Sequence, residues 1–242
     1  MKKGIFTLTE ARFAAPGLRL MRLRGDTGDA AGPGRFVEVS VPGFFLRRPF
    51  SVCGVEGDTL TVVVKLAGRG TERLLSLPEG AQLELLTGLG NGFDLERAGG
   101  QPLFLGGGSG VAPMLYLARE LSKLGVRPST AIGFGTAAEA CFEREFQELC
   151  PELRVFTMDG TLGERGLVTQ ALGEGYSFVY ACGPLPMLRA IDEKSPVRAQ
   201  FSLEARMGCG FGACMGCTIE TAKGPRRVCK DGPVFNSGEV RW

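Results

Sequence analysis

Four cysteines near the carboxyl end restrict what this chain can fold into more than any other feature. They follow the spacing C-x4-C-x2-C-x11-C and are Cys209, Cys214, Cys217 and Cys229. The first three lie among glycines and small residues, which let a backbone turn tightly around a bound group. This spacing is typical of a plant-type [2Fe–2S] site, where a short loop supplies three thiolates and a fourth arrives from further along. The segment therefore predicts a one-electron carrier.

A structural zinc site is the main alternative for these thiolates. Zinc ligands usually come as two C-x2-C pairs, and only Cys214 and Cys217 form one here. The chain has no histidine, which excludes a Rieske centre, histidine-ligated metals and any mechanism with a histidine base. Three further cysteines, Cys53, Cys141 and Cys150, have no ligand spacing and are expected to be small buried side chains.

Composition excludes several classes of protein. A net charge of +2 without a block of Lys or Arg argues against a nucleic-acid binder. No stretch approaches the ~18 apolar residues of a membrane span, and the charged start lacks the apolar region of a signal peptide. With no sign of export, disulfides are not expected, and a reducing cytoplasm is the expected setting.

The pattern of strands and helices changes once along the chain. In the first ~100 residues, β-rich segments at 18–24, 35–41 and 59–66 alternate with turns, and one short helix is expected at 70–77. Closely spaced strands of this kind predict a small antiparallel barrel.

From about residue 101 strands alternate with helices, which predicts a mostly parallel sheet covered on both faces. The expected strands are 102–107, 129–134, 153–158, 177–181 and 197–203, and the expected helices are 111–121, 138–149, 166–172 and 185–192. The cysteine segment that follows is short and loop-like, so it is not expected to build a core without its metal.

Two short motifs in the first region suit a phosphate-containing ligand. Arg48-Pro49-Phe50-Ser51 opens a strand, and Gly70-Thr71 opens the short helix. An arginine fork binds phosphate, a serine can hydrogen-bond a ribityl or pyrophosphate oxygen, and a helix N-terminus favours an anion. Taken alone, each motif is better explained as a surface arginine or a helix cap. The two motifs indicate a ligand site only in combination with the glycine turns that follow in the sequence.

Two glycine turns follow strands of the second region. One is the run 106–113, G-G-G-S-G-V-A-P, and the other begins with Cys182-Gly183-Pro184. The first is not the G-x-G-x-x-G fingerprint, although it would present amides and a helix end to a dinucleotide in the same way, and a simple packing turn is the alternative. Because ligands bind at the carboxyl ends of strands in open α/β sheets, both turns are expected to line one crevice.

In this order the motifs R-x-x-S, G-G-G-x-G-x-A-P and C-G-P-x-x-M resemble the ferredoxin–NAD(P) reductase superfamily over nearly the whole chain. The tail, from F-S-L-E-A-R-M-G-C-G to V-C-K-D-G-P-V-F, is similar to the electron transfer subunits of NAD-dependent dihydroorotate dehydrogenases. The resemblance implies an FAD-binding barrel over 1–100, an NAD-binding α/β domain over 101–203 and a [2Fe–2S] segment over 204–242. The implied partner is the FMN-containing catalytic subunit, in a heterotetramer with two copies of each chain.

The resemblance also implies roles for individual residues. The flavin would be held by Arg48, Pro49, Phe50, Ser51, Val64, Lys65, Leu66, Gly70 and Thr71. The nicotinamide nucleotide would contact Gly107, Gly108, Gly110, Cys182, Gly183, Pro184 and Met187. Phe50 stands where these subunits more often have an aliphatic residue, while other reductases place an aromatic ring on the flavin, so its stacking stays open. The compact gap before Cys229 is interpreted as a shortened hairpin.

The residue that follows the third predicted strand bears on the choice of nucleotide. NADPH-dependent members usually have Ser or Thr and Arg there, whereas this chain has Asp159. A carboxylate hydrogen-bonds a ribose diol and repels a 2′-phosphate, so NAD is expected. Arg165 lies close in sequence and keeps NADP open as an alternative.

The implied function is transfer of electrons from the partner's FMN through [2Fe–2S] and FAD to NAD⁺ in pyrimidine biosynthesis. Dihydroorotate itself is not expected to bind this chain. The alternatives are a reductase subunit for an oxygenase, a hydrogenase or a ferredoxin:NADP oxidoreductase, a zinc-stabilised binding module, and a flavin-binding scaffold without nicotinamide turnover. In the ferredoxin:NADP enzymes the first cluster ligand is often aspartate, so Cys209 favours the pyrimidine pathway.

Overall fold

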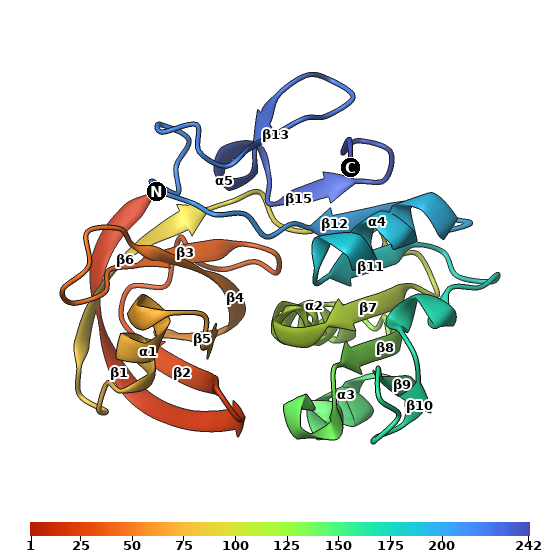
Figure 1. Ribbon diagram of the computed structural model, residues 1–242, viewed down its shortest axis with the longest axis horizontal. Helices are drawn as coiled ribbons and strands as arrows, with labels where there is room; N and C mark the ends of the chain where they lie inside the picture. Colours follow the sequence, from red (N-terminus) through yellow and green to blue (C-terminus); the bar gives the residue numbers. More distant parts are fainter.

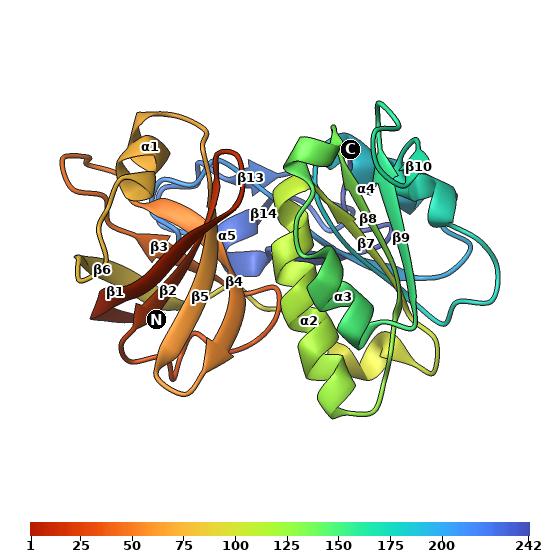
Figure 2. The same ribbon diagram turned by 90° about the horizontal axis from the view of Figure 1, so that it is seen from below.

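Two lobes lie side by side, and the last part of the chain runs along their common edge (Figure 1). The computed structural model describes all 242 residues, Met1–Trp242. In the view from below, helix α2 (Val111–Lys123) lies on the side of the second lobe that faces the first (Figure 2). No helix has the length and apolar character needed to cross a membrane.

The first lobe is a closed antiparallel barrel with the strand order β1-β2-β5-β4-β3-β6, as the turn-separated strands predicted. Its strands are β1 (Lys2–Ala15), β2 (Leu18–Arg24), β3 (Phe36–Val39), β4 (Arg48–Glu56), β5 (Thr59–Lys65) and β6 (Gln82–Leu89). Helix α1 (Arg69–Leu75) connects β5 to β6. The 14-residue strand β1 was not expected, and it closes the barrel because it pairs with both β2 and β6.

The second lobe is a seven-stranded sheet in the order β10-β9-β8-β7-β11-β12-β15. Its strands are β7 (Leu103–Gly107), β8 (Ser129–Phe134), β9 (Glu152–Thr157), β10 (Glu164–Arg165), β11 (Val179–Cys182), β12 (Ala199–Ser202) and β15 (Val234–Asn236). All neighbours are parallel except β12 and β15. Helices α2 and α3 (Glu143–Leu149) share one apolar core with the sheet, and α4 (Leu185–Lys194) belongs to another, which confirms the doubly covered sheet.

Two of the expected helices are wrong in extent. The helix expected over 138–149 begins only at Glu143, because Phe142 has a left-handed backbone (φ 65°) that interrupts a helix. The helix expected over 166–172 is only a 3-10 turn, η4 (Val168–Ala171). Gly166 and Gly173 lie on either side of it and leave too few residues for a stable α-helix.

The tail joins the sheet of the second lobe instead of forming a loop without a core. Strands β13 (Thr218–Ile219) and β14 (Arg226–Arg227) form the hairpin that the compact cysteine spacing indicated. After α5 (Val228–Asp231), β15 pairs antiparallel with β12. Phe235 and Val228 are buried in the same core as Phe201. The domain boundaries at 100 and 203 stay predictions, and β15 extends the sheet beyond the second of them.

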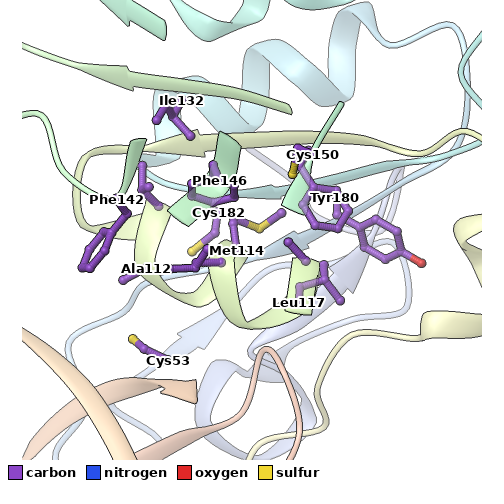
Figure 3. Packing of buried hydrophobic residues seen from close by; sticks show 14 of the residues in the cluster. Cys53, Ala112, Met114, Leu117, Ile132, Phe142, Phe146, Cys150, Tyr180 and Cys182 are labelled. Atoms are coloured by element: carbon purple, nitrogen blue, oxygen red, sulfur yellow. The ribbon is translucent and has the colours of Figure 1, made fainter. Parts of the chain in front are cut away.

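An apolar core also crosses from one lobe to the other. Leu18, Cys53 and Val63 of the barrel belong to the same buried cluster as the residues of α2. Figure 3 shows Cys53 on its barrel strand beside the side chains of the helix. Cys141 and Cys150 are buried in this cluster too, which confirms the expectation for these three cysteines.

A single side chain ties the linker between the lobes to the returning tail. The amide of Asn91 donates through Nδ2 to the carbonyl of Val234 (2.8 Å) and accepts through Oδ1 from the Val234 N–H (3.1 Å). The Asn91 N–H donates to the carbonyl of Gly232 (2.9 Å). Because Val234 is only 4% exposed, its peptide groups depend on this side chain for their hydrogen bonds.

We therefore expect Asn91→Ala to lower the free energy of unfolding by about 1 to 2 kcal/mol, since two backbone groups of Val234 lose their partners. Asn91→Asp keeps the acceptor for the Val234 N–H, but at neutral pH it sets a carboxylate oxygen against the Val234 carbonyl, so it should destabilise at least as much as Asn91→Ala. Equilibrium urea unfolding followed by the fluorescence of Trp242, the one tryptophan, measures both. Equal stability of wild type and Asn91→Ala would show that water replaces the side chain at no cost.

Candidate functional site

The four tail cysteines are arranged as two pairs of thiols. The backbone N–H of Cys214 lies against the Cys209 sulfur, and the backbone N–H of Cys229 lies against the Cys217 sulfur. Cys214 is exposed and Cys209 half-buried, whereas Cys217 and Cys229 are buried. One pair therefore faces the surface and the other faces the protein.

Backbone amides already point at the sulfurs of both pairs. Cys209 Sγ accepts from the N–H groups of Ala213 (3.2 Å) and Cys214 (3.5 Å), and Cys217 Sγ accepts from Cys229 (3.4 Å). Burial opposes ionisation of Cys209, but the amide hydrogen bonds outweigh it and lower its pKa to about 6. Burial and the neighbouring Cys217 thiol raise the pKa of Cys229 to about 12. The thiol of Cys209 is therefore ionised more easily than that of Cys229.

This donor set fits a two-iron cluster. Each iron of a [2Fe–2S] cluster takes two thiolates, which matches two pairs, and N–H···S bonds stabilise the anionic sulfurs. A single zinc ion would instead require all four thiols to surround one point. The loop that carries the outer pair depends on glycine, since Gly210 and Gly212 have φ values of 78° and 91°.

A buried carboxylate lies under this loop on the barrel side. Glu38 of β3 is fully buried, and neither of its oxygens has a hydrogen-bond partner. A Cβ on Gly210 would stand 2.5 Å from Glu38 Cγ, so the loop touches the barrel here and only glycine fits. Burial raises the pKa of Glu38 to about 7, Arg47 limits the rise, and the Cys209 sulfur adds to it.

A cavity of about 300 Å³ opens between the barrel, the start of α2 and the tail. Seven of the predicted site residues line it: Arg48, Pro49, Phe50, Ser51, Lys65, Thr71 and Gly110. Val64 points into the barrel core instead, and Leu66 is half exposed outside the cavity wall. Any contact of Val64 with a ligand in the cavity would therefore involve its backbone.

At one end of the cavity the guanidinium of Arg48 lies over Gly70. A Cβ on Gly70 would be 2.8 Å from Arg48 Nε and Nη2, so only glycine allows this approach. The Thr71 hydroxyl donates to the Gly68 carbonyl and accepts from the N–H groups of Ala67 and Gly68, so it caps α1. A cation beside the first turn of a helix is an arrangement that fits the pyrophosphate of a dinucleotide such as FAD.

The two glycine turns of the sheet lie against each other. A Cβ on Gly110 would stand 2.3 Å from the Cys182 carbonyl oxygen, and one on Gly107 would stand 2.7 Å from Met187 Sδ. Gly183 likewise packs on Gly107, and a Cβ on Gly107 would be 3.1 Å from Pro184. Strands β7 and β11 are adjacent, so the two turns meet at the carboxyl ends of these strands, and a nucleotide bound there stays a prediction. Gly108 has a φ of 55° and open space around it.

Asp159 lies just beyond the carboxyl end of β9, further along the same edge of the sheet. Its Oδ1 accepts from the N–H of Thr161 (3.0 Å) and from its hydroxyl (2.6 Å), and these hydrogen bonds lower the pKa of the carboxyl. The charge is therefore fixed in place and exposed to a nucleotide that would lie across the sheet.

Relatives of the chain point to one family. It is 43% identical to the dihydroorotate dehydrogenase B (NAD(+)) electron transfer subunit of Bacillus caldolyticus over 224 residues, 86% of each chain. The subunit of Lysinibacillus sphaericus (strain C3-41) is 39% identical over 235 residues, 91% of each chain. Residues 204–241 match the iron-sulfur cluster binding domain of dihydroorotate dehydrogenase B. The chain belongs to this family of electron transfer subunits.

Solved structures agree on the fold. The NADH-dependent reduced ferredoxin–NADP oxidoreductase has a chain that superposes with a TM-score of 0.89 at 26% identity, over 98% of this chain and 90% of that one. Phthalate dioxygenase reductase superposes with a TM-score of 0.68 at 20% identity, over 84% of this chain and 69% of that one. The second likeness concerns the fold alone.

Several residues of the site were missed from the sequence. The tail contributes Glu204, Ala205, Met207 and Pro233 to the cavity wall, and β3 contributes Glu38 under the cysteine loop. Enclosure raises the pKa of Glu204, while Lys65 limits the rise. The signal available was the motif F-S-L-E before the cysteines, which contributed to the family resemblance but had no role assigned. Glu38 had no signal, because an alternating strand with one acidic residue normally places it outside.

The buried carboxyl of Glu38 makes stability depend on pH. Because its pKa is raised above the ordinary 4.5, its contribution favours the folded state below about pH 4.5 and is lost as the pH rises through 7. Glu38→Gln should therefore be more stable than wild type at about pH 8, by roughly 1 to 2 kcal/mol, and nearly equal to it at about pH 5. Thermal unfolding followed by circular dichroism at both pH values tests this. An equal difference at the two values would mean that Glu38 does not titrate as described.

Proposed function

We propose that this chain carries electrons from the FMN-containing catalytic subunit of dihydroorotate dehydrogenase to NAD⁺ in pyrimidine biosynthesis. The relatives that share up to 43% of its residues are electron transfer subunits of that enzyme. FAD would occupy the cavity between the barrel and α2, NAD the crevice of the glycine turns, and the [2Fe–2S] cluster the two thiol pairs. We expect two copies of each subunit in the complex.

The observation that carries this proposal is the continuity of one segment between the two cofactor sites. Ala205 and Met207 line the cavity proposed for the flavin, and Cys209 follows two residues later. Pro233 lines the same cavity and follows Cys229 by four residues. A chain that places its thiols within a few residues of the cavity wall is suited to one-electron transfer between the groups bound there.

When bound, FAD exchanges a hydride with NAD⁺ and single electrons with the cluster, which is chemistry that no side chain supplies. The residues of the protein would bind and orient the flavin and shield it from water. Arg48 offers its guanidinium to the pyrophosphate, and Phe50 and Ser51 line the cavity wall. The amides of the cysteine loop lower the cost of anionic sulfur. No residue has to act as a general base, which is consistent with a chain that has no histidine.

NAD is the favoured nucleotide and the cytoplasm the favoured location. Asp159 presents a fixed carboxylate at the edge of the sheet, where a 2′-phosphate would be repelled. The four cysteines outside the tail are buried and form no disulfide, which is consistent with a reducing compartment. Arg165 packs beside Gly160, the residue directly after Asp159, and is the residue to test if NADPH proves equally good.

Arg48→Ala tests the flavin site. Loss of a charge-assisted phosphate contact should weaken FAD retention by about 2 kcal/mol, or roughly thirtyfold in the dissociation constant. Acid release followed by chromatography identifies the flavin, and ultrafiltration after dilution measures its retention. Arg35→Ala is a matched control on the same lobe, since Arg35 does not line the cavity. Release of FMN, or equal retention in both variants, would contradict the assignment.

Reconstitution with the catalytic subunit tests the function as a whole. The isolated chain should oxidise NADH with artificial acceptors and show no turnover of dihydroorotate. The mixed subunits should form a stable complex that reduces NAD⁺ with dihydroorotate. Cys209→Ala should abolish NAD⁺ reduction in that complex, while dihydroorotate still reduces the FMN of the partner.

Two outcomes separate this function from its alternatives. Stoichiometric zinc without iron in the native protein would identify a zinc-stabilised module. Reduction of ferredoxin or NADP⁺ that exceeds the dihydroorotate-linked rate would favour the ferredoxin:NADP oxidoreductases, whose structure superposes closely. An equally active complex without the cluster would contradict electron transfer through this chain.

A further inference from the structure

The loop that carries the outer thiol pair and the segment that carries the last cysteine are separated in sequence by the β13–β14 hairpin. Cys209 and Cys214 precede the β13–β14 hairpin, and Cys229 follows it. For the pairs to meet at cluster spacing, something must hold these two segments together. The Val228 N–H donates to the Cys217 carbonyl (3.1 Å), which joins only the inner pair.

One arginine contacts both segments. Arg227 Nη1 donates to the carbonyl of Gly212, inside the loop between Cys209 and Cys214 (3.0 Å). Its Nε donates to Asp231 Oδ2 (3.3 Å), and its own N–H donates to the same oxygen (2.7 Å). Asp231 lies two residues after Cys229, so the guanidinium spans from the outer loop to the segment of the last ligand.

The environment of this contact makes it more than a surface ion pair. The side chains of Arg227 and Asp231 are 26% and 22% exposed, so water competes less with their hydrogen bonds than at an open surface. Gly212 has a φ of 91°, and a Cβ there would stand 2.7 Å from Lys230 Cδ. The loop carbonyl that Arg227 holds is therefore fixed from both sides.

We propose that Arg227, oriented by Asp231, is a positioning residue that holds the outer thiol loop against the last-cysteine segment and so slows loss of the cluster. A planar guanidinium can donate to two acceptors at a fixed angle, whereas a lysine ammonium at the same place cannot keep both contacts with the same geometry. The side chain of Arg227 contacts the Gly212 carbonyl, the Asp231 carboxylate and the Met215 sulfur, and none of the four cysteine sulfurs. The inference rests on the proposed function, since it assumes that the thiol pairs hold a cluster.

The test compares Arg227→Lys with Arg226→Lys in the complete, cofactor-loaded protein. Arg226 is the adjacent residue of the same strand and is half-buried, and its side chain makes no hydrogen bond or ion pair within the chain. Loss of visible absorbance in the presence of an iron chelator gives the rate of cluster loss. We expect Arg227→Lys to lose its cluster about tenfold faster than wild type, equivalent to about 1.4 kcal/mol, and Arg226→Lys to match wild type.

Three further measurements separate positioning from general destabilisation. FAD content and the Trp242 unfolding midpoint should stay at wild-type values in Arg227→Lys, while the electron paramagnetic resonance spectrum of the reduced cluster should shift. Asp231→Asn should speed cluster loss as well. Combined with Arg227→Lys it should add little, because both act through one contact.

Equal rates of cluster loss in Arg227→Lys and Arg226→Lys would overturn the inference. So would a parallel fall of the Trp242 unfolding midpoint, or full additivity of the two substitutions. If Arg227→Lys does not fold, Asp231→Asn alone decides, and a wild-type rate of cluster loss in it overturns the inference. A wild-type protein without iron would instead overturn the proposed function, so the two failures are distinguishable.

Discussion

The side-chain amide of Asn91 makes two hydrogen bonds with the backbone of Val234, as a neighbouring strand would. The position of the tail relative to the two lobes depends on this contact. It fixes Val234 beside the chain that leaves the barrel. The Leu203 N–H donates to the Pro233 carbonyl, so the segment that leads into the cysteine loops and the segment that leaves them meet at the same place. The cysteine loops are therefore held at both of their ends beside the flavin cavity. A hydrophobic contact alone would not define this position as closely, because apolar burial has no direction.

Electrostatics at the cysteine site differ between its two sides. Hydrogen bonds from backbone amides lower the pKa of Cys209, whereas burial raises the pKa of Cys229. Glu38 adds a buried carboxylate below the loop, and Arg227 adds a guanidinium beside it. A site with such unequal surroundings stabilises added charge unequally on its two halves. The protein can thus influence where an electron resides with groups that do not bind the metal.

Prediction from the sequence succeeded where a local pattern has one structural solution. The apolar run at 129–134 became β8 with the expected bounds, and strand–helix alternation required a mostly parallel sheet. Prediction failed where a single backbone angle set the start of an element. The left-handed backbone of Phe142 makes the helix begin at Glu143 instead of residue 138. The cysteine spacing predicted a set of ligands, but Glu38 could not be found, because burial of this acidic residue depends on a loop that lies 172 residues further along the chain.

The amino-acid sequence by itself determined the kind of chemistry, through four cysteines in a fixed spacing, two glycine turns, an arginine–serine motif and the absence of histidine. Those features are local, since a turn or a ligand spacing depends on neighbouring residues only. Only the tertiary structure decided how the sites meet: that the tail lines the flavin cavity, that the thiols form an outer and an inner pair, and that Arg227 joins two loops. These contacts join residues far apart in sequence, and they exist only after the apolar cores have brought the segments together.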